Sequence, residues 1–219
     1  MSALVKVCGV TTVDDARAAA EAGADYIGVI VGIEQSPRCI DAAAAAAIAD
    51  AAGVPVICLL DRPASRLQDI LSRANPAGVQ LIGTYSSEDI RAVKGAAGCA
   101  VWKTLHIPRS GAAREAEVPG QDRIEEVFAA GADVIVLDTL VKNMKGGTGR
   151  TCDWESAAAL VGRASGRVFL AGGINPDNAA EAVRTVRPAG IDVSSGVEDR
   201  PGRKNIQKVS RLIRAVKGA

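Results

Sequence analysis

The 219-residue sequence has a single histidine, His106, and few aromatic residues, which make up 3% of the chain. One imidazole cannot build a multi-histidine zinc site or an HExxH helix, so hydrolysis by a histidine-bound metal is excluded. Lysine and arginine number 26 against 25 aspartate and glutamate, and this balance provides no excess positive charge for nucleic acid. Since few rings are present for bases to stack on, no nucleic-acid partner is expected.

The five cysteines are odd in number, scattered and free of C-x-x-C spacing, which excludes a disulfide framework and favours reduced thiols in the cytoplasm. The N-terminal run MSALVKVCGV contains Lys6 and is followed by no small-residue cleavage site, so it is predicted to be a strand rather than a secretory signal. The nearest candidate for a membrane span is the Ala-rich stretch 41–60. Asp50, Gly53 and Pro55 interrupt it, which predicts a helix followed by a strand and no membrane partner.

One phrase occurs four times along the chain and predicts four passages from a helix into a buried strand. In each copy a glycine precedes a short run of β-branched residues, and we expect this glycine to stop the helix in the left-handed conformation. The copies are AGADYIGVI (22–30), PAGVQLIG (76–83), AGADVIVLD (130–138) and PAGIDVSSG (188–196), and their leading glycines are Gly23, Gly78, Gly131 and Gly190.

Four further apolar runs bring the expected strands to eight: 4–8, 54–60, 100–107 and 166–173. Helical segments such as 12–23, 175–186 and 205–218 separate or follow the strands. Strict alternation requires a parallel sheet, and eight units with no linker between them predict a single (β/α)8 TIM barrel domain spanning 1–219. An open doubly wound sheet is the alternative, but the first strand runs into CGVTT and lacks the G-x-G-x-x-G fingerprint of that fold.

Chemistry in such a barrel is confined to the C-terminal ends of the strands, because apolar side chains fill the interior. Cys8 ends the first strand, and strand alternation places it on the same face as Lys6, with Cβ atoms about 6–7 Å apart. An ammonium at that range favours the thiolate and makes Cys8 a candidate base or nucleophile. The alternative is that Cys8 is a small hydrophobic core residue.

Asp138 closes the apolar run VIVL, and burial at the lip of this strand would raise its pKa and keep a proton available for general acid catalysis. The alternative is an aspartate that caps a loop by accepting from backbone N–H groups. Since the two strands lie at different sides of the barrel mouth, a substrate fits between a base at Cys8 and an acid at Asp138.

The last two strands end in the small-residue loops AGGINPDN (171–178) and DVSSGVED (192–199). Barrels commonly bind phosphate here through backbone amides and a short helix N-terminus; tight turns without a ligand are the alternative. The stretch KGGTGRT (145–151) lacks the Walker A pattern, because Met144 stands where a glycine is required. It is predicted to be a glycine-hinged lid.

Several polar residues allow two interpretations each. Arg38, within SPR, is a candidate for holding a substrate carboxylate through its planar fork, or else a solvated surface arginine. Gln80 is expected either to orient a substrate by hydrogen bonding or to satisfy a neighbour inside the barrel. Trp102 and His106 are expected to be structural or to line a pocket, with a catalytic role for His106 as the alternative. The charged run EDRPGRK (198–204) is predicted to be a solvated loop.

Taken in order, the strand ends resemble those of the phosphoribosylanthranilate isomerase family, (β/α)8 enzymes of tryptophan biosynthesis. The resemblance covers about residues 6–204 and rests on KVCGVTT, SPR, VQL, LDT with GGTGRTCDW, LAGGINPDN and IDVSSGVED with PGRK. It implies an Amadori rearrangement, in which N-(5'-phosphoribosyl)anthranilate, an aminoaldose, becomes the 1-deoxyribulose aminoketose. The implied partner is therefore a small phosphorylated sugar, with no cofactor and no metal, and the expected assembly is a monomer or a homodimer.

The resemblance also implies roles for individual residues. Cys8 would be the general base and Asp138 the general acid, while Arg38 would bind the anthranilate carboxylate. Gln80 is expected among the substrate-binding residues. The residues implied around the phosphate are Gly172, Gly173, Ser194, Ser195 and Gly196.

The chain departs from the family pattern around the expected aryl pocket. The family usually has Q-L-H-G where this chain has Ile82 in place of the histidine. The run GVIVG (28–32) replaces a phenylalanine-rich strand, and Cys152 stands where an aromatic residue is common. Two alternatives follow: a divergent paralogue that isomerises another phosphoribosylamine, and a non-catalytic barrel that binds a sugar phosphate.

Overall fold

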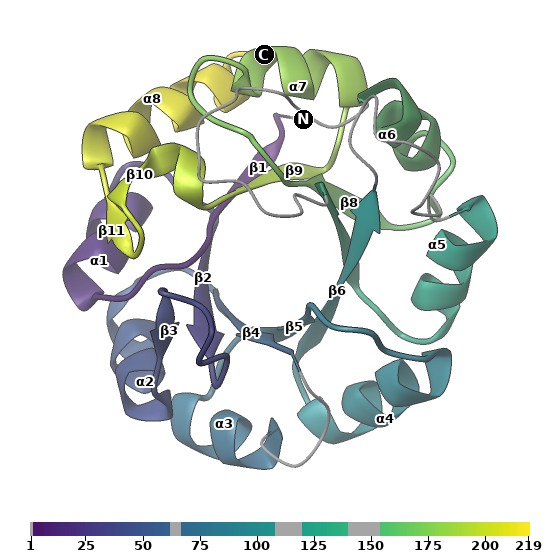
Figure 1. Ribbon diagram of the computed structural model, residues 1–219, viewed down its shortest axis with the longest axis horizontal. Helices are drawn as coiled ribbons and strands as arrows, with labels where there is room; N and C mark the ends of the chain where they lie inside the picture. The colour runs from purple at the N-terminus through teal and green to yellow at the C-terminus, as the bar shows by residue number, and fades with distance from the viewer. Residues whose placement is uncertain (1, 62–66, 108–119, 140–153) are drawn as a thin grey trace.

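The computed structural model describes residues 2–61, 67–107, 120–139 and 154–219, and eight parallel strands in these ranges form a closed ring (Figure 1). The first strand pairs with both the second and the last strand of the ring, which closes it. The predicted (β/α)8 barrel is therefore confirmed. The ring strands are β1 (Leu4–Val7), β2 (Tyr26–Val31), β4 (Val56–Leu60), β5 (Gly78–Leu81), β6 (Ala100–Ile107), β7 (Val134–Thr139), β8 (Arg167–Leu170) and β9 (Gly190–Val193).

Helices surround the ring on its outer side (Figure 1). No helix within the described ranges is long and apolar enough to cross a membrane. The helices are α1 (Val13–Glu21), α2 (Ala42–Ala51), α3 (Leu67–Ala74), α4 (Ser87–Ala97), α5 (Gln121–Ala129), α6 (Trp154–Val161), α7 (Ala179–Val186) and α8 (Ile206–Lys217). The shorter elements are β3 (Cys39–Ile40), η1 (Ser195–Val197), β10 (Glu198–Arg200) and β11 (Arg203–Lys204).

Side-chain caps determine where several helices begin. The Thr12 side chain accepts from the N–H of Asp15 at the start of α1, and Asp41 caps α2 in the same way. Ser86 and Asp89 form a reciprocal capping box at the start of α4. These caps satisfy N–H groups that have no partner within the helix, so the sequence fixes the helix starts locally.

The prediction for the four repeated glycines is correct for two of them. Gly23 and Gly131 follow their helices with φ of 101° and 105°. Gly78 and Gly190 instead begin strands β5 and β9. A Cβ on Gly190 would collide with the Phe169 ring. This glycine is therefore required for close packing between strands, and not for ending a helix. In those two repeats the residues with positive φ near the ends of the helices are Asn75 and Arg187.

An aromatic cluster fills the barrel interior below the strand ends. Tyr26, Trp102 and Phe169 contact one another, with ring centroids 4.9 Å apart for Trp102 and Phe169 and 5.1 Å apart for Tyr26 and Trp102. Trp102 is 2% exposed, which confirms its structural interpretation. Because this cluster fills the interior near the N-terminal ends of the strands, we expect a small molecule inside the ring to bind at the C-terminal ends.

Candidate active site

A cavity of about 580 Å³ opens at the C-terminal ends of the strands. Its wall includes residues that follow or end β1, β5, β7, β8 and β9, which are far apart in sequence. The structure therefore brings all the predicted site residues to one place, although their roles remain predictions. They are Cys8, Arg38, Gln80, Asp138, Gly172, Gly173, Ser194, Ser195 and Gly196.

Cys8 directly follows β1 and is 6% exposed. Its N–H donates to the carbonyl of Val193 over 2.8 Å, which fixes the thiol at the junction of β1 and β9. Space for the sulfur comes from Gly28 on β2, where a Cβ would lie 2.8 Å from Cys8 Sγ and 3.0 Å from Lys6 Nζ. Any larger residue at position 28 would displace the thiol or the ammonium beneath it.

Lys6 forms a buried ion pair below Cys8. Its Nζ lies 2.9 Å from Asp192 Oδ2 and 3.0 Å from Oδ1, and the Lys6 side chain is fully buried. Burial raises the pKa of the Cys8 thiol; Lys6 and Lys204 act in the opposite direction, and Asp192 adds to the increase. The prediction that Lys6 favours the thiolate is thus correct for its own charge, but the net direction of the shift is opposite. The prediction omitted burial and the Asp192 carboxylate.

Titration of Cys8 should show this raised pKa directly. The ultraviolet absorbance of the thiolate, taken as the difference between wild type and Cys8→Ser, is expected to appear with a midpoint above the ordinary value of 9.0. Asp192→Asn should move the midpoint to lower pH, because it removes a negative charge that opposes ionisation and leaves the Lys6 charge unneutralised. A wild-type midpoint below 9.0, or no movement in the variant, would contradict this account.

Lys6→Met is expected to lower the free energy of unfolding by about 3–5 kcal/mol, because it leaves the buried Asp192 carboxylate without its partner. Urea unfolding measures the loss. The double variant Lys6→Met with Asp192→Asn also removes the orphaned charge, so it should recover part of the stability. If the double variant is no more stable than the single one, lost packing and not the unpaired charge explains the effect.

Asp138 lies within β7, one residue before its end, and is partly buried. It is therefore part of the strand and not of the loop after it. In the pairing of β6 with β7, Asp138 is opposite His106, and both residues line the cavity. Burial, together with the nearby Lys103, lowers the pKa of His106, so its imidazole is neutral at neutral pH.

The small-residue loops after β8 and β9 touch each other at one side of the cavity. Gly172 and Gly173 have φ of 85° and 70°, which other residues rarely adopt. A Cβ on Gly196 would collide with the carbonyl of Ile174, so the two loops are in direct backbone contact. Ser194 lies between β9 and the short helix η1. Backbone and hydroxyl groups of this kind suit a phosphate.

Gln80 bonds to a neighbour inside the barrel, as one of its two interpretations predicts, and its amide oxygen remains without a hydrogen-bond partner among the described residues. Its Nε2 donates to Thr104 Oγ1 over 3.0 Å inside the barrel. Its Oε1 is buried and has no hydrogen-bond partner among the described residues. Within the described ranges, no three histidine, cysteine, aspartate or glutamate side chains are grouped so that they could hold a metal ion.

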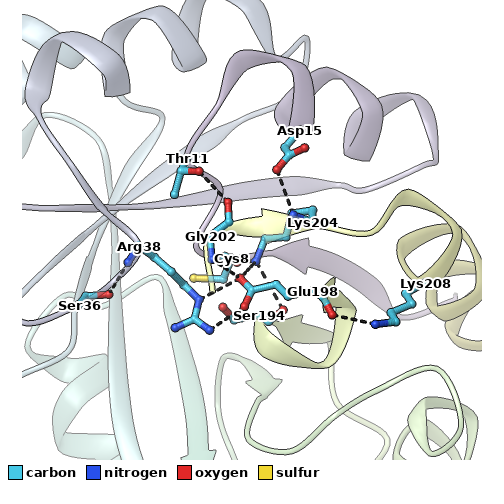
Figure 2. Close-up of polar contacts among 10 residues, drawn as sticks. All are labelled: Cys8, Thr11, Asp15, Ser36, Arg38, Ser194, Glu198, Gly202, Lys204 and Lys208. Carbon is cyan, nitrogen blue, oxygen red and sulfur yellow. Dashed lines mark hydrogen bonds and ion pairs between the residues drawn. The ribbon is translucent and has the colours of Figure 1, made fainter. Parts of the chain in front are cut away.

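Residues 198–204 form a β-hairpin of β10 and β11, so the prediction of a solvated loop is correct for the exposed residues around its turn and wrong for its two ends. Glu198 and Lys204, at its two ends, are each 7% exposed. Figure 2 shows Glu198 between Arg38 and Lys204, next to Cys8. Arg38 is therefore held by a carboxylate of the protein and is not a solvated surface arginine.

Sequence reasoning missed Glu198 and Lys204 as members of the site. The available signal was a carboxylate and an ammonium six residues apart, on either side of a Pro-Gly turn, which suits a hairpin with paired ends. Their partner Arg38 is 160 positions from Glu198 in the sequence, so no local pattern could identify it. The predicted lid (145–151) and Cys152 lie outside the described residues.

The chain is similar to known proteins along nearly its whole length. Residues 5–215 match the family described as N-(5'phosphoribosyl)anthranilate (PRA) isomerase. An N-(5'-phosphoribosyl)anthranilate isomerase of Halorubrum lacusprofundi is 39% identical, over 96% of this chain and 95% of that protein. In a solved structure, monomers of a dimeric phosphoribosylanthranilate isomerase of Thermotoga maritima are 30% identical with a TM-score of 0.79, over 99% of this chain and 100% of that one.

A further solved structure shows a phosphoribosyl anthranilate isomerase in complex with reduced 1-(o-carboxyphenylamino)-1-deoxyribulose 5-phosphate. It is 27% identical with a TM-score of 0.78, and the match covers 99% of this chain and 100% of that one. The family match and the relatives together extend over nearly the whole sequence. The chain belongs to the N-(5'-phosphoribosyl)anthranilate isomerase family.

Proposed function

We propose that this protein converts N-(5'-phosphoribosyl)anthranilate into 1-(2-carboxyphenylamino)-1-deoxyribulose 5-phosphate, an isomerisation in tryptophan biosynthesis, with Cys8 as the general base and Asp138 as the general acid. The observation that carries the proposal is that a thiol and a carboxyl group from β1 and β7 line one cavity. The Gly- and Ser-rich loops line the same cavity, so they supply an anion site beside the acid and the base.

The role of each residue follows from the bond that must break. Asp138 protonates the furanose ring oxygen, because oxygen leaves more easily as a hydroxyl, and the ring opens to a protonated Schiff base. The cationic imine acidifies the neighbouring C2'–H bond, and Cys8 removes that proton in its thiolate form, which the raised pKa of the thiol makes the minor form at neutral pH. The resulting enolamine tautomerises to the aminoketose. Only protons are transferred, so the reaction needs no cofactor.

The two ends of the substrate carry different anions, and the cavity offers a separate group for each. Arg38 provides a guanidinium for the anthranilate carboxylate. Gln80 provides its buried Oε1 as an acceptor for a substrate hydroxyl. The residues proposed to surround the phosphate are Gly172, Gly173, Ser194, Ser195 and Gly196.

A fluorescence assay tests the proposal. Purified protein mixed with N-(5'-phosphoribosyl)anthranilate is expected to produce a first-order decrease of the anthranilate-type fluorescence. No decrease with the wild-type protein would overturn the proposed substrate. Turnover of a different phosphoribosylamine in its place would then identify a divergent paralogue, and binding without turnover would identify a sugar-phosphate-binding barrel.

A further inference from the structure

Glu198 is a buried carboxylate that contacts two cations at once. Its Oε1 accepts from Arg38 Nε over 2.9 Å, and its Oε2 accepts from Arg38 Nη2 over 2.6 Å. Lys204 Nζ donates to the same Oε1 over 2.7 Å. The Glu198 and Lys204 side chains are only 3% and 2% exposed. We call these three residues the Glu198 triad.

The contacts within the triad hold one edge of the Arg38 guanidinium. A guanidinium has five N–H donors in a rigid plane, and Glu198 takes the Nε donor and one Nη2 donor. Among the described residues, the Arg38 side chain donates to no other group. Of the three remaining donors, one on Nη1 and one on Nη2 lie side by side on the outer edge, whose geometry suits a second carboxylate. Because Arg38 also lines the cavity, that carboxylate can belong to a bound molecule.

Lys204 connects the triad to the backbone at two strand ends. Its Nζ donates to the carbonyl of Cys8 over 2.5 Å and to the carbonyl of Ser194 over 3.4 Å. The backbone at Gly9, next to Cys8, packs closely against the Arg38 and Ser194 side chains. A Cβ on Gly9 would lie 2.5 Å from Arg38 Cδ and 2.9 Å from Ser194 Oγ. The cysteine, the arginine and the serine loop are therefore held in one fixed arrangement (Figure 2).

The charge on Glu198 is maintained by its neighbours. Burial alone would raise its pKa, but hydrogen bonds and attraction from Arg38 and Lys204 outweigh burial and hold the pKa below its ordinary value. The carboxylate is consequently ionised at neutral pH, and it can hold the guanidinium plane throughout that range. Two cations against one carboxylate leave the triad with an excess positive charge, which favours an incoming anion.

We propose that Glu198 is a positioning residue that orients Arg38 so that its outer edge binds the aryl carboxylate of the substrate, while Lys204 keeps this edge in register with Cys8. This inference rests on the proposed function and deepens it. A competing explanation is that Glu198 only pins the β10–β11 hairpin to the barrel. The two explanations differ in whether a substitution of Glu198 affects ligands with and without an aryl carboxylate equally.

The test measures the affinity of two products that differ only in that carboxylate. For the carboxylated product, 1-(2-carboxyphenylamino)-1-deoxyribulose 5-phosphate, Glu198→Gln is expected to raise Kd by about 10- to 100-fold, because the Arg38 plane is released. For 1-phenylamino-1-deoxyribulose 5-phosphate, Kd should change less than about threefold. Asp199→Asn is the matched control, since it removes an exposed carboxylate of the same hairpin and should change neither Kd.

Glu198→Asp keeps the charge but shortens the side chain, so it should cause a smaller loss with the same selectivity; it also provides the test if Glu198→Gln fails to fold. Equal losses for both products, or no loss, would overturn the positioning role. In the Arg38→Met background, Glu198→Gln should cause no further selective loss. The fluorescence assay of the wild type distinguishes failure of the proposed function from failure of this inference. If the wild type does not turn over the substrate, the proposed function fails and this inference fails with it. If it does, but the losses of affinity in the Glu198 variants are equal for both products, only this inference is refuted.

Discussion

Asp138→Asn is expected to lower kcat by about 10²- to 10⁴-fold, the range that one positioned general acid contributes. Asparagine has nearly the same shape as aspartate, so the substrate still fits, but the amide cannot deliver a proton to the ring oxygen. The furanose ring then has to open with a much poorer leaving group. Decay of substrate fluorescence under saturating conditions measures the loss, and circular dichroism checks that the variant keeps the overall secondary structure of the wild type.

A kinetic isotope effect separates the role of Asp138 from that of the base. If Asp138 acts at ring opening, its loss makes that step rate-limiting, so the effect of deuterium at C2' should approach unity in Asp138→Asn. Retention of kcat within tenfold of the wild-type value would contradict the assigned role. An isotope effect that grows in this variant would move Asp138 to the proton-abstraction step instead.

The barrel could be predicted because its causes are local. Alternation of apolar runs with Ala-rich helical segments recurs along the chain, and eight such units have one natural closed arrangement. The repeated glycines were only partly predictable, since contacts from neighbouring strands require Gly78 and Gly190: chiefly the Ala100 backbone for the first and the Phe169 ring for the second. The contacts of Gly190 with Phe169 arise because the pairing of β8 with β9 places these two residues side by side.

The location of the candidate site was predictable for the same geometric reason. The carboxyl ends of parallel strands meet at one rim, so Cys8 and Asp138 share a cavity despite their separation in sequence. Pairing partners were not predictable, because Lys6 with Asp192 and Arg38 with Glu198 are separated by 186 and 160 positions. The net direction of the Cys8 pKa, which burial dominates, and the buried ends of the β10–β11 hairpin were missed because both depend on contacts that only the folded chain makes.

Cys8→Ser is expected to lower kcat by about 10³- to 10⁴-fold, at the upper end of the range for one general base. A serine hydroxyl is far less acidic than a thiol, and the burial that already raises the pKa of Cys8 would oppose its ionisation further. The fluorescence assay used for the wild type measures the loss.

Binding and isotope measurements distinguish a lost base from a damaged site. Because Arg38 and the loops after β8 and β9 are unchanged, Cys8→Ser should bind reduced 1-(o-carboxyphenylamino)-1-deoxyribulose 5-phosphate with a Kd within about threefold of wild type. Proton removal then limits turnover, so the C2' deuterium effect should increase, opposite to its change in Asp138→Asn. If the two variants change the isotope effect in the same direction, the assignment of acid and base to separate steps is wrong.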